Sequence, residues 1–434
     1  MERTDTKTIT RNDILMFCAF FASFLHSVLG LAFLAILFLS CFKGKTQCIK
    51  VLLLLTARGI MSSAVAAAFG NSILRLAVIF TASLLVFCHT KRAAPGNRKV
   101  SSVLICAFLF AFFALLSSLL NSSYPVVAVL KIFSFVVPFV AVLCGVTATR
   151  EYRWKEYFVV LFGMLFAVSF VLIPFDRFRI VNADFQGVFN HVNCCGIVGA
   201  LYIAVLLHLD TFKKYTKIRA IILILTLIMI YLSASRTGLF SALLTIAFYY
   251  AFSKESKAAK VLLTLGISVL LLFFVLASRS SLLSDILETA NEFIYKSNAE
   301  SIWSSRSKAI AVAKEKFANS NLFGSGFMVP WMQGFTSYEL SFDLVVEPGN
   351  IVWSILGDTG IVGAVLFVLL IINIFSHGEK RNLFLLIAAL SINMGEMVFF
   401  SSNNMAILVW FVIALYLSAS PQKAALQGSK EGKQ

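Results

Sequence analysis

The sequence predicts an all-α polytopic membrane protein, and two observations carry this prediction. Of the 434 residues, 59% are apolar and only 13% are charged, whereas a soluble domain carries about 25% charged residues. Apolar runs long enough for membrane helices also recur along the chain, and the mean hydropathy is +0.88. This composition excludes a soluble globular enzyme, a disordered chain and a secreted disulfide scaffold.

The first apolar run, residues 14–42, is longer than one membrane helix of about 20 residues requires. His26, Ser27 and Gly30 interrupt it near its middle, so it forms either one tilted helix or a hairpin of two. The chain is therefore predicted to have about 14 transmembrane helices, or 13 if the first run is a single helix. The further apolar runs lie near 51–69, 73–90, 100–120, 126–147, 157–175, 195–212, 219–234, 237–252, 261–277, 351–375, 383–400 and 405–420.

The distribution of basic residues orients these helices. The formal net charge of +16 marks cytoplasmic loops in a membrane protein rather than a groove for nucleic acid. Neighbouring basic clusters are separated by even numbers of apolar runs, so all of them can lie in the cytoplasm, and the charges of the N-terminus favour the hairpin. The predicted outward links are 70–72, 121–125, 176–194, 235–236, 278–350 and 401–404.

The chain is divided into an N-terminal transmembrane bundle (1–277), a large extracytoplasmic loop (278–350), C-terminal transmembrane helices (351–420) and a cytoplasmic tail (421–434). A loop as long as 278–350 is usually functional. Its residues 281–297 have an apolar helical face, which can lie on the bilayer or pack on the protein. A second helix is predicted from Ser304 or Ser305 to about Ala318.

Several cations lie on the predicted outer side, where the positive-inside rule disfavours them. Arg236 occupies a tight link between two apolar runs, and Arg306 lies in the first turn of a predicted helix, where a cation opposes the helix dipole. Arg236 either binds an anion or extends to the lipid headgroups. Arg306 either binds an anion or is a solvated surface residue. Further cations lie near the outer ends of other runs: Arg75, Lys131, Arg177 and Arg179.

Polar residues also border the outer side. His191 and Asn193 precede the run at 195–212, where they can hydrogen-bond a polar ligand, or Asn193 can act as the N-cap of a helix. Glu347 precedes the run at 351–375, beside Asn350, and can serve as a general base on a hydroxyl or complement the helix dipole. No metal-binding or nucleotide-binding motif is found, so no cofactor and no metal are expected.

Four motifs in order give the chain a resemblance to a family. They resemble the O-antigen polymerase and O-antigen ligase superfamily of bacterial inner-membrane glycosyltransferases, the Wzy type. The motifs are Phe189-Asn-His-Val-Asn193-x-x-Gly196, Ser233-Ala-Ser235-Arg236-Thr-Gly238, Arg306 with Leu322-Phe-Gly324-Ser-Gly326, and Gly357-x-x-Gly360-x-x-Gly363.

The resemblance implies a GT-C-like helical fold and an inverting glycosyl transfer without metal or nucleotide sugar. It implies a donor and an acceptor glycan linked to undecaprenyl pyrophosphate, on the outer face of the inner membrane. It places Arg236 and Arg306 near the donor pyrophosphate, because guanidinium groups match phosphate oxygens. A chain-length regulator is a further candidate partner. The candidate substrate-binding residues are His191, Asn193, Lys131, Arg75 and Asn350.

One departure from the family pattern favours a polymerase over a ligase. The ligase pattern has a His followed by Asn before the helix that follows the large loop, whereas this chain has Glu347-Pro-Gly-Asn350. Either Glu347 takes the role of base or the chemistry relies on substrate orientation. The alternatives are a ligase that transfers glycan to lipid A-core and a flippase of lipid-linked oligosaccharides, which should show related halves. A peptidoglycan polymerase of the shape-and-division class shares the large outer loop, but its motif set is not found.

Overall fold

The computed structural model describes residues 10–70, 72–89, 98–175, 178, 184–209, 215–252, 307–330, 349–402 and 405–418. Within these ranges the regular secondary structure is helical, and one isolated β-bridge joins Met61 to Phe189. Among the described helices, four are long and apolar enough to cross a membrane: Lys99–Asn121, Pro125–Ala148, Trp154–Val171 and Ile351–His377. With several shorter apolar helices, they indicate a multi-pass membrane protein whose described part is all-helical. The count of 14 helices stays a prediction.

The first apolar run forms two helices, α1 (Arg11–Ala22) and α2 (Ser27–Ser40), rather than one. This is the alternative that the charge pattern favours. His26 caps the second helix, because its Nδ1 accepts a hydrogen bond of 3.2 Å from the backbone N–H of Val28. The chain continues into α3 (Lys45–Gly59) and α4 (Ser72–Cys88).

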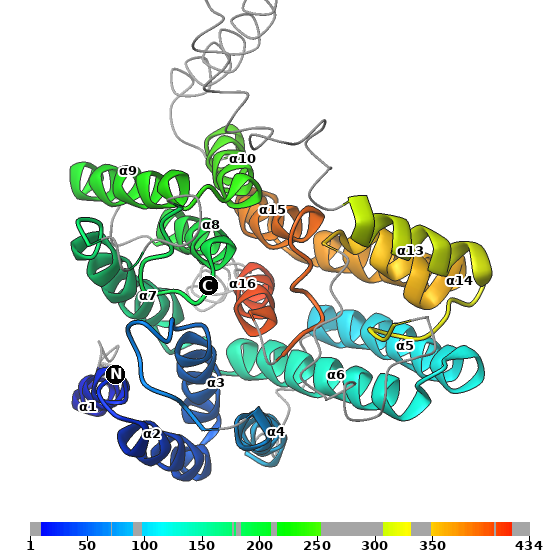
Figure 1. The fold of residues 1–434 in the computed structure, drawn as a ribbon, viewed down its shortest axis with the longest axis horizontal. Helices are drawn as coiled ribbons and strands as arrows, with labels where there is room; N and C mark the ends of the chain where they lie inside the picture. The colour runs from blue at the N-terminus through cyan, green and yellow to red at the C-terminus, as the bar shows by residue number, and fades with distance from the viewer. Residues whose placement is uncertain are drawn as a thin grey trace, which may run out of the picture.

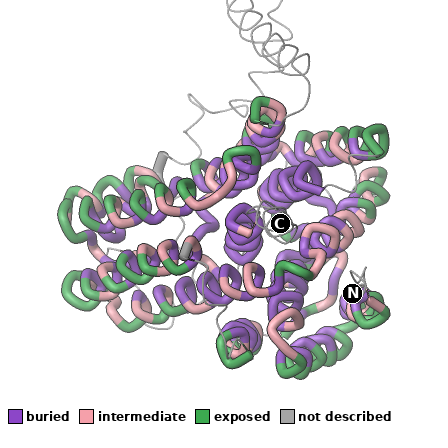
Figure 2. Tube along the Cα trace, turned by 180° about the vertical axis from the view of Figure 1, so that it is seen from behind, coloured by how far each residue is buried: buried purple, intermediate pink, exposed green. Residues whose placement is uncertain are grey.

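Two helices form the centre of the molecule, α8 (Val192–His208) and α16 (Ala406–Ser418). Both are apolar on all sides and buried along almost their whole length, as expected of helices surrounded by other helices. Figure 1 shows α16 in the middle, and Figure 2 shows its buried surface from behind. The surrounding helices are α5 (Arg98–Asn121), α6 (Pro125–Ala148), α7 (Trp154–Val171), α9 (Thr216–Leu232), α10 (Arg236–Phe252), α13 (Ser307–Asn319), α14 (Ile351–His377) and α15 (Leu383–Ser391).

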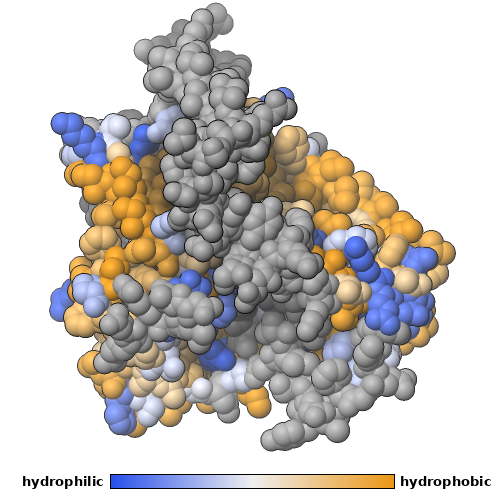
Figure 3. Space-filling view, turned by 45° about the horizontal axis from the view of Figure 1, so that its top comes forward, coloured by the Kyte–Doolittle hydropathy of each residue, from blue (hydrophilic) through white to orange (hydrophobic). Residues whose placement is uncertain are grey.

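The outer helices expose large apolar side chains. Ile105 and Phe112 of α5 are 60% exposed, and Val365 and Ile372 of α14 are more than half exposed. Figure 3 shows apolar surface over much of both flanks of the molecule. A water-facing surface of this kind would favour aggregation, whereas in a bilayer it contacts lipid tails.

Two predicted membrane runs are not continuous helices. In the run at 51–69, α3 ends at Gly59, and in the run at 383–400, α15 ends at Ser391. The backbone beyond each end finds other partners: Asn190 N donates to the carbonyl of Ile60 at 2.9 Å. After α15 a side chain serves instead, since Asn393 Oδ1 accepts a hydrogen bond of 2.9 Å from Val398 N. The run at 261–277 lies outside the described residues.

Predicted outer links contact the adjoining ends of neighbouring membrane runs. Ser62 N donates to the carbonyl of Val188 at 2.8 Å, and Phe327 N donates to Ser118 Oγ at 3.0 Å. We call this the candidate outer end; its described parts are residues 60–70, 118–125, 184–196, 233–238, 320–330, 349–350 and 393–402. The side of the membrane that it faces stays a prediction.

Cysteine labelling of intact cells tests this orientation. Ser123 belongs to the candidate outer end, Lys380 to a predicted cytoplasmic link, and both are exposed. In a background in which the exposed Cys18 and Cys88 are replaced by Ser, Ser123→Cys should react with a membrane-impermeant maleimide and Lys380→Cys should not. The reverse pattern would contradict the predicted orientation.

Candidate active site

The beginnings of α8 and α10 are in close contact at the candidate outer end. A Cβ atom on Gly238 would lie 2.4 Å from the Cα of Gly196, so only glycine permits this approach. The segment after α15 packs against the same place, since a Cβ on Gly395 would lie 2.2 Å from Thr237 Oγ1. Gly196 and Gly238, the glycines of the first two motifs, are therefore required for the close approach of α8 and α10.

The start of α14 joins this arrangement through Asn350. Its side chain is buried and caps the helix, because Oδ1 accepts hydrogen bonds from Val352 N at 3.0 Å and Trp353 N at 3.2 Å. Its Nδ2 donates to the carbonyl of Met394 at 3.0 Å. Asn350 therefore fixes α14 against the segment that follows α15, and its role in substrate binding stays a prediction.

Arg236 is the first residue of α10 and is half-buried. The preceding turn is tight: Ala234 has a φ of 48°, and Arg236 N donates to the carbonyl of Ala234 at 3.1 Å. A cation at a helix N-terminus opposes the dipole, so helix stability does not explain this residue. An anion bound there would meet both the guanidinium and the dipole of the helix.

The structure corrects the alternative role of Asn193. The N-cap of α8 is His191, whose Nδ1 accepts a hydrogen bond of 3.1 Å from the backbone N–H of Asn193. The side chain of Asn193 is therefore available for another contact, and its Nδ2 donates to Glu396 Oε1 at 2.5 Å. His191 itself is exposed at the candidate outer end.

Glu396 is a residue that the sequence reasoning missed. It is half-buried and lies in the segment that follows α15. The sequence does indicate it in one way: Glu396 is the only charged residue in the apolar run at 383–400. Ionisable side chains within such runs are usually functional.

Two further predicted residues, Arg75 and Lys131, border the candidate outer end and are half-buried. A Cβ on Gly59 would lie 3.5 Å from Arg75 Nη1, next to the backbone that contacts Asn190. Lys131 lies one turn before Ser134 on α6, and Ser134 Oγ lies 3.3 Å from Ser402 Oγ of the segment after α15. The other predicted site residues lie outside the described residues: Arg177, Arg179, Arg306 and Glu347.

A groove of about 590 Å³ adjoins the site between α13 and α14. Its volume is in the range of small-molecule sites. Lys314 Nζ lies 5.0 Å from the centre of the Trp353 ring, which supplies a broad aromatic surface. The lining residues are Ile310, Ala311, Lys314, Asn350, Val352, Trp353 and Met394.

A buried ion pair fixes the end of the large loop to α14. Lys316 Nζ bonds to Asp358 Oδ1 and donates to the carbonyls of Gly326 at 2.7 Å and Val329 at 2.8 Å. Asp358 Oδ2 accepts a hydrogen bond of 3.0 Å from Met328 N. The predicted second helix of the loop is confirmed as α13, and Lys316 anchors the turn that follows it.

The glycine motif of α14 marks a break in that helix. Gly360 has a φ of 64°, which releases backbone groups from helical hydrogen bonds. The loop satisfies them, since Ile361 N donates to the carbonyl of Asn321 at 2.9 Å and Val362 N to that of Leu322 at 3.2 Å. The described parts of the last two motifs, residues 322–326 and 357–363, therefore form one interlocked structure.

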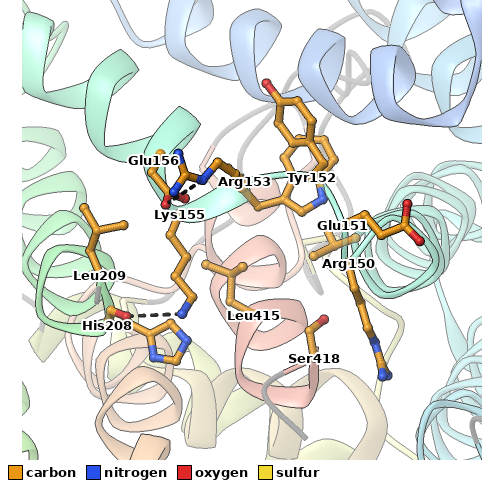
Figure 4. Close-up of a pocket in the computed structure, with 12 residues that line it drawn as sticks. Arg150, Glu151, Tyr152, Arg153, Lys155, Glu156, His208, Leu209, Leu415 and Ser418 are labelled. Atoms are coloured by element: carbon orange, nitrogen blue, oxygen red, sulfur yellow. Dashed lines mark hydrogen bonds and ion pairs between the residues drawn. The ribbon is translucent and has the colours of Figure 1, made fainter. Parts of the chain in front are cut away.

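A second cavity, of about 310 Å³, lies at the opposite end of the molecule (Figure 4). Three of its charged groups have partners: Lys155 Nζ donates to the carbonyl of His208 at 3.3 Å, and Arg153 pairs with Glu156 at 3.4 Å. Burial, with a contribution from the Asp13 carboxylate, raises the pKa of the Tyr152 hydroxyl, which donates to Asp13 at 3.3 Å. These pairings favour a structural role over a catalytic one.

Comparison with known proteins agrees with the resemblance seen in the motifs. Residues 221–368 match the model of the O-antigen ligase family. No match is found among the curated proteins. The family match confirms the resemblance to the O-antigen polymerase and ligase superfamily and supports a membrane glycosyltransferase of polymerase or ligase type. The matched region includes Arg236, Lys316, Asn350 and Asp358, whereas Asn193 and Glu396 lie outside it.

Proposed function

We propose that this protein polymerises lipid-linked oligosaccharide repeat units into O-antigen or a related surface polysaccharide. The reaction takes place on the outer face of the bacterial inner membrane, and undecaprenyl pyrophosphate carries both glycans. The observation that carries the proposal is the half-buried Arg236 at the N-terminus of α10, where α8 and α14 also begin. The family match at 221–368 supports the same class of reaction.

In the proposed reaction, an acceptor hydroxyl attacks the anomeric carbon of the donor sugar while the bond from that carbon to the pyrophosphate breaks. Arg236 and Arg306 hold the pyrophosphate and stabilise the charge that develops on the leaving oxygen. Glu347 takes the proton of the attacking hydroxyl. No nucleotide sugar is required, because the lipid pyrophosphate is itself the activated leaving group, and the two arginines supply the positive charge that a metal ion would otherwise supply.

Mass spectrometry of the glycan that accumulates when the gene is deleted tests the proposal. If the protein is a polymerase, the deletion strain should accumulate single repeat units on the lipid carrier at the outer leaflet. Complete polymer that is not attached to lipid A-core would support a ligase instead, in agreement with the name of the matched family. Single units that stay at the cytoplasmic leaflet would support a flippase.

The role of Glu347 predicts a specific defect. Glu347→Gln keeps the size and hydrogen bonding of the side chain but cannot take a proton, so single repeat units should accumulate on the carrier. Asp343→Asn, a change to a nearby carboxylate of the same loop, should leave polymer length unchanged. Electrophoresis of the extracted glycan measures both. Full-length polymer from Glu347→Gln would show that another group accepts the proton.

A further inference from the structure

Glu396 is held firmly by its own segment of the chain. Its backbone N–H donates to the carbonyl of Ile392 at 2.9 Å, and Asn393 Oδ1 accepts a hydrogen bond of 2.9 Å from Val398 N. The adjacent Gly395 packs directly against Thr237, the second residue of α10. Glu396 is therefore positioned beside the start of α10, because the contact between Gly395 and Thr237 fixes the residue before it.

The side chains of Glu396 and Asn193 lie together in this place. Asn193 Nδ2 donates to Glu396 Oε1 at 2.5 Å, and both residues are partly accessible. A carboxylate accepts hydrogen bonds, whereas an amide both donates and accepts. The hydroxyl groups of a sugar both donate and accept hydrogen bonds, so a carboxylate beside an amide can bind neighbouring hydroxyl groups. Hydrogen bonds to the charged carboxylate are stronger than those between neutral groups.

The groove between α13 and α14 is lined by a residue of the same segment that carries Glu396. Met394, two residues before Glu396, lines the groove together with Asn350, and the amide of Asn350 donates to the carbonyl of Met394. Trp353 supplies an aromatic ring in the groove, and such a ring combines a large apolar surface with a polar edge. A sugar ring can stack on such a surface.

We propose that Asn193 and Glu396 bind the hydroxyl groups of the acceptor sugar, and that the groove at Trp353 receives the next part of the acceptor glycan. This inference rests on the proposed function. Arg236, which precedes the Thr237 that contacts Gly395, then holds the donor. Glu347 and Glu396 have different tasks, because one takes the proton and the other binds the sugar.

A purely structural role for Glu396 makes a different prediction. If Glu396 only braces the start of α8, Glu396→Gln should have no effect, because the amide oxygen of Gln can still accept from Asn193 Nδ2. If Glu396 binds the acceptor sugar, the same variant loses a charged group that accepts hydrogen bonds from the sugar. It gains an N–H group that can only donate one. The substitution therefore separates the two roles without removing the brace.

The test uses the full-length protein in proteoliposomes with lipid-linked repeat units as donor. The variable acceptor is the soluble repeat unit, released by mild acid from the lipid-linked material that the deletion strain accumulates. We expect Glu396→Gln and Asn193→Ala to raise the apparent KM for the soluble acceptor about tenfold or more, the size of a lost hydrogen bond to a charged group. The value of kcat at saturating acceptor should change less than threefold.

Two further variants sharpen the result. Trp353→Ala should also raise the KM for the soluble acceptor, and Trp353→Phe should restore most of it, because Phe keeps an aromatic face. Glu379→Gln, which changes a carboxylate of the link between α14 and α15, should match the wild type. Equal melting temperatures of the purified variants exclude misfolding as the cause.

The outcomes separate the acceptor site from the proposed function. An active wild type with an unchanged KM in Glu396→Gln, or a lower kcat with an unchanged KM, would overturn the acceptor site alone. A wild type that forms no polymer from lipid-linked repeat units would overturn the proposed function and the acceptor site with it.

Discussion

Replacing Arg236 with Ala is expected to abolish or severely reduce polymer formation while the protein level in the membrane stays unchanged. Arg236 begins α10 at a helix N-terminus and is only half-buried, so its removal leaves the packed core intact. Loss of one donor aimed at developing charge typically lowers the rate about 10²–10³-fold. The measurement is the rate of polymer formation in membrane vesicles, normalised to the amount of protein.

The matched variants of Arg236 separate charge from geometry. Arg236→Lys keeps the positive charge but cannot form the two parallel hydrogen bonds of a guanidinium, so it should also be impaired. Arg306→Ala should behave like Arg236→Ala if both hold the pyrophosphate. Arg381→Ala, an exposed cation in the predicted cytoplasmic link after α14, serves as the control. Normal polymer from both Arg236→Ala and Arg306→Ala would indicate that Arg236 and Arg306 contact only lipid headgroups.

Replacing Lys316 with Ala is expected to destabilise the protein strongly. The side chain is buried and bonds to Asp358 and to two carbonyls of the turn at 326–329. Its removal leaves a buried carboxylate without its cation, and breaking a buried pair in this way costs about 3–5 kcal/mol. The expected results are a lower melting temperature in detergent and a reduced amount of protein in the membrane.

The reason for this instability can be tested with a paired substitution. Lys316→Met combined with Asp358→Leu removes both charges and keeps apolar volume, so it should recover much of the lost stability. Lys314→Ala, on the same helix but exposed, should change stability by no more than about 0.5 kcal/mol. If Lys316→Ala melts like Lys314→Ala, the pair does not hold the loop to α14.

The sequence is sufficient to predict the overall class of this protein. Long apolar runs and few charges require helices in a bilayer, because backbone groups in lipid must be satisfied within each segment. The polar break at His26 and Ser27 marked the boundary between α1 and α2, and Ser305 lay close to the start of α13. The sequence also identifies Arg236 as a candidate functional residue, because a single cation between two apolar runs is energetically unfavourable unless it has a function.

The lengths of the individual helices could not be read from hydropathy. The run at 383–400 is apolar enough for a full helix, yet α15 ends at Ser391, and the chain beyond it contacts α10 at Thr237 and α8 at Asn193. Hydropathy measures transfer into an apolar environment, and a buried irregular segment and a membrane helix share that property. The prediction therefore missed both the break and the position of Glu396.

The sequence by itself determined the membrane class, the order of the motifs and the residues that need an explanation, because composition and charge act along the chain. Only the tertiary structure decided which of them meet. Asn193 and Glu396 are 203 positions apart, and Lys316 and Asp358 are 42 apart, yet each pair is in direct contact. Such contacts depend on how helices pack at Gly196, Gly238 and Gly360, where the absence of a side chain permits close approach.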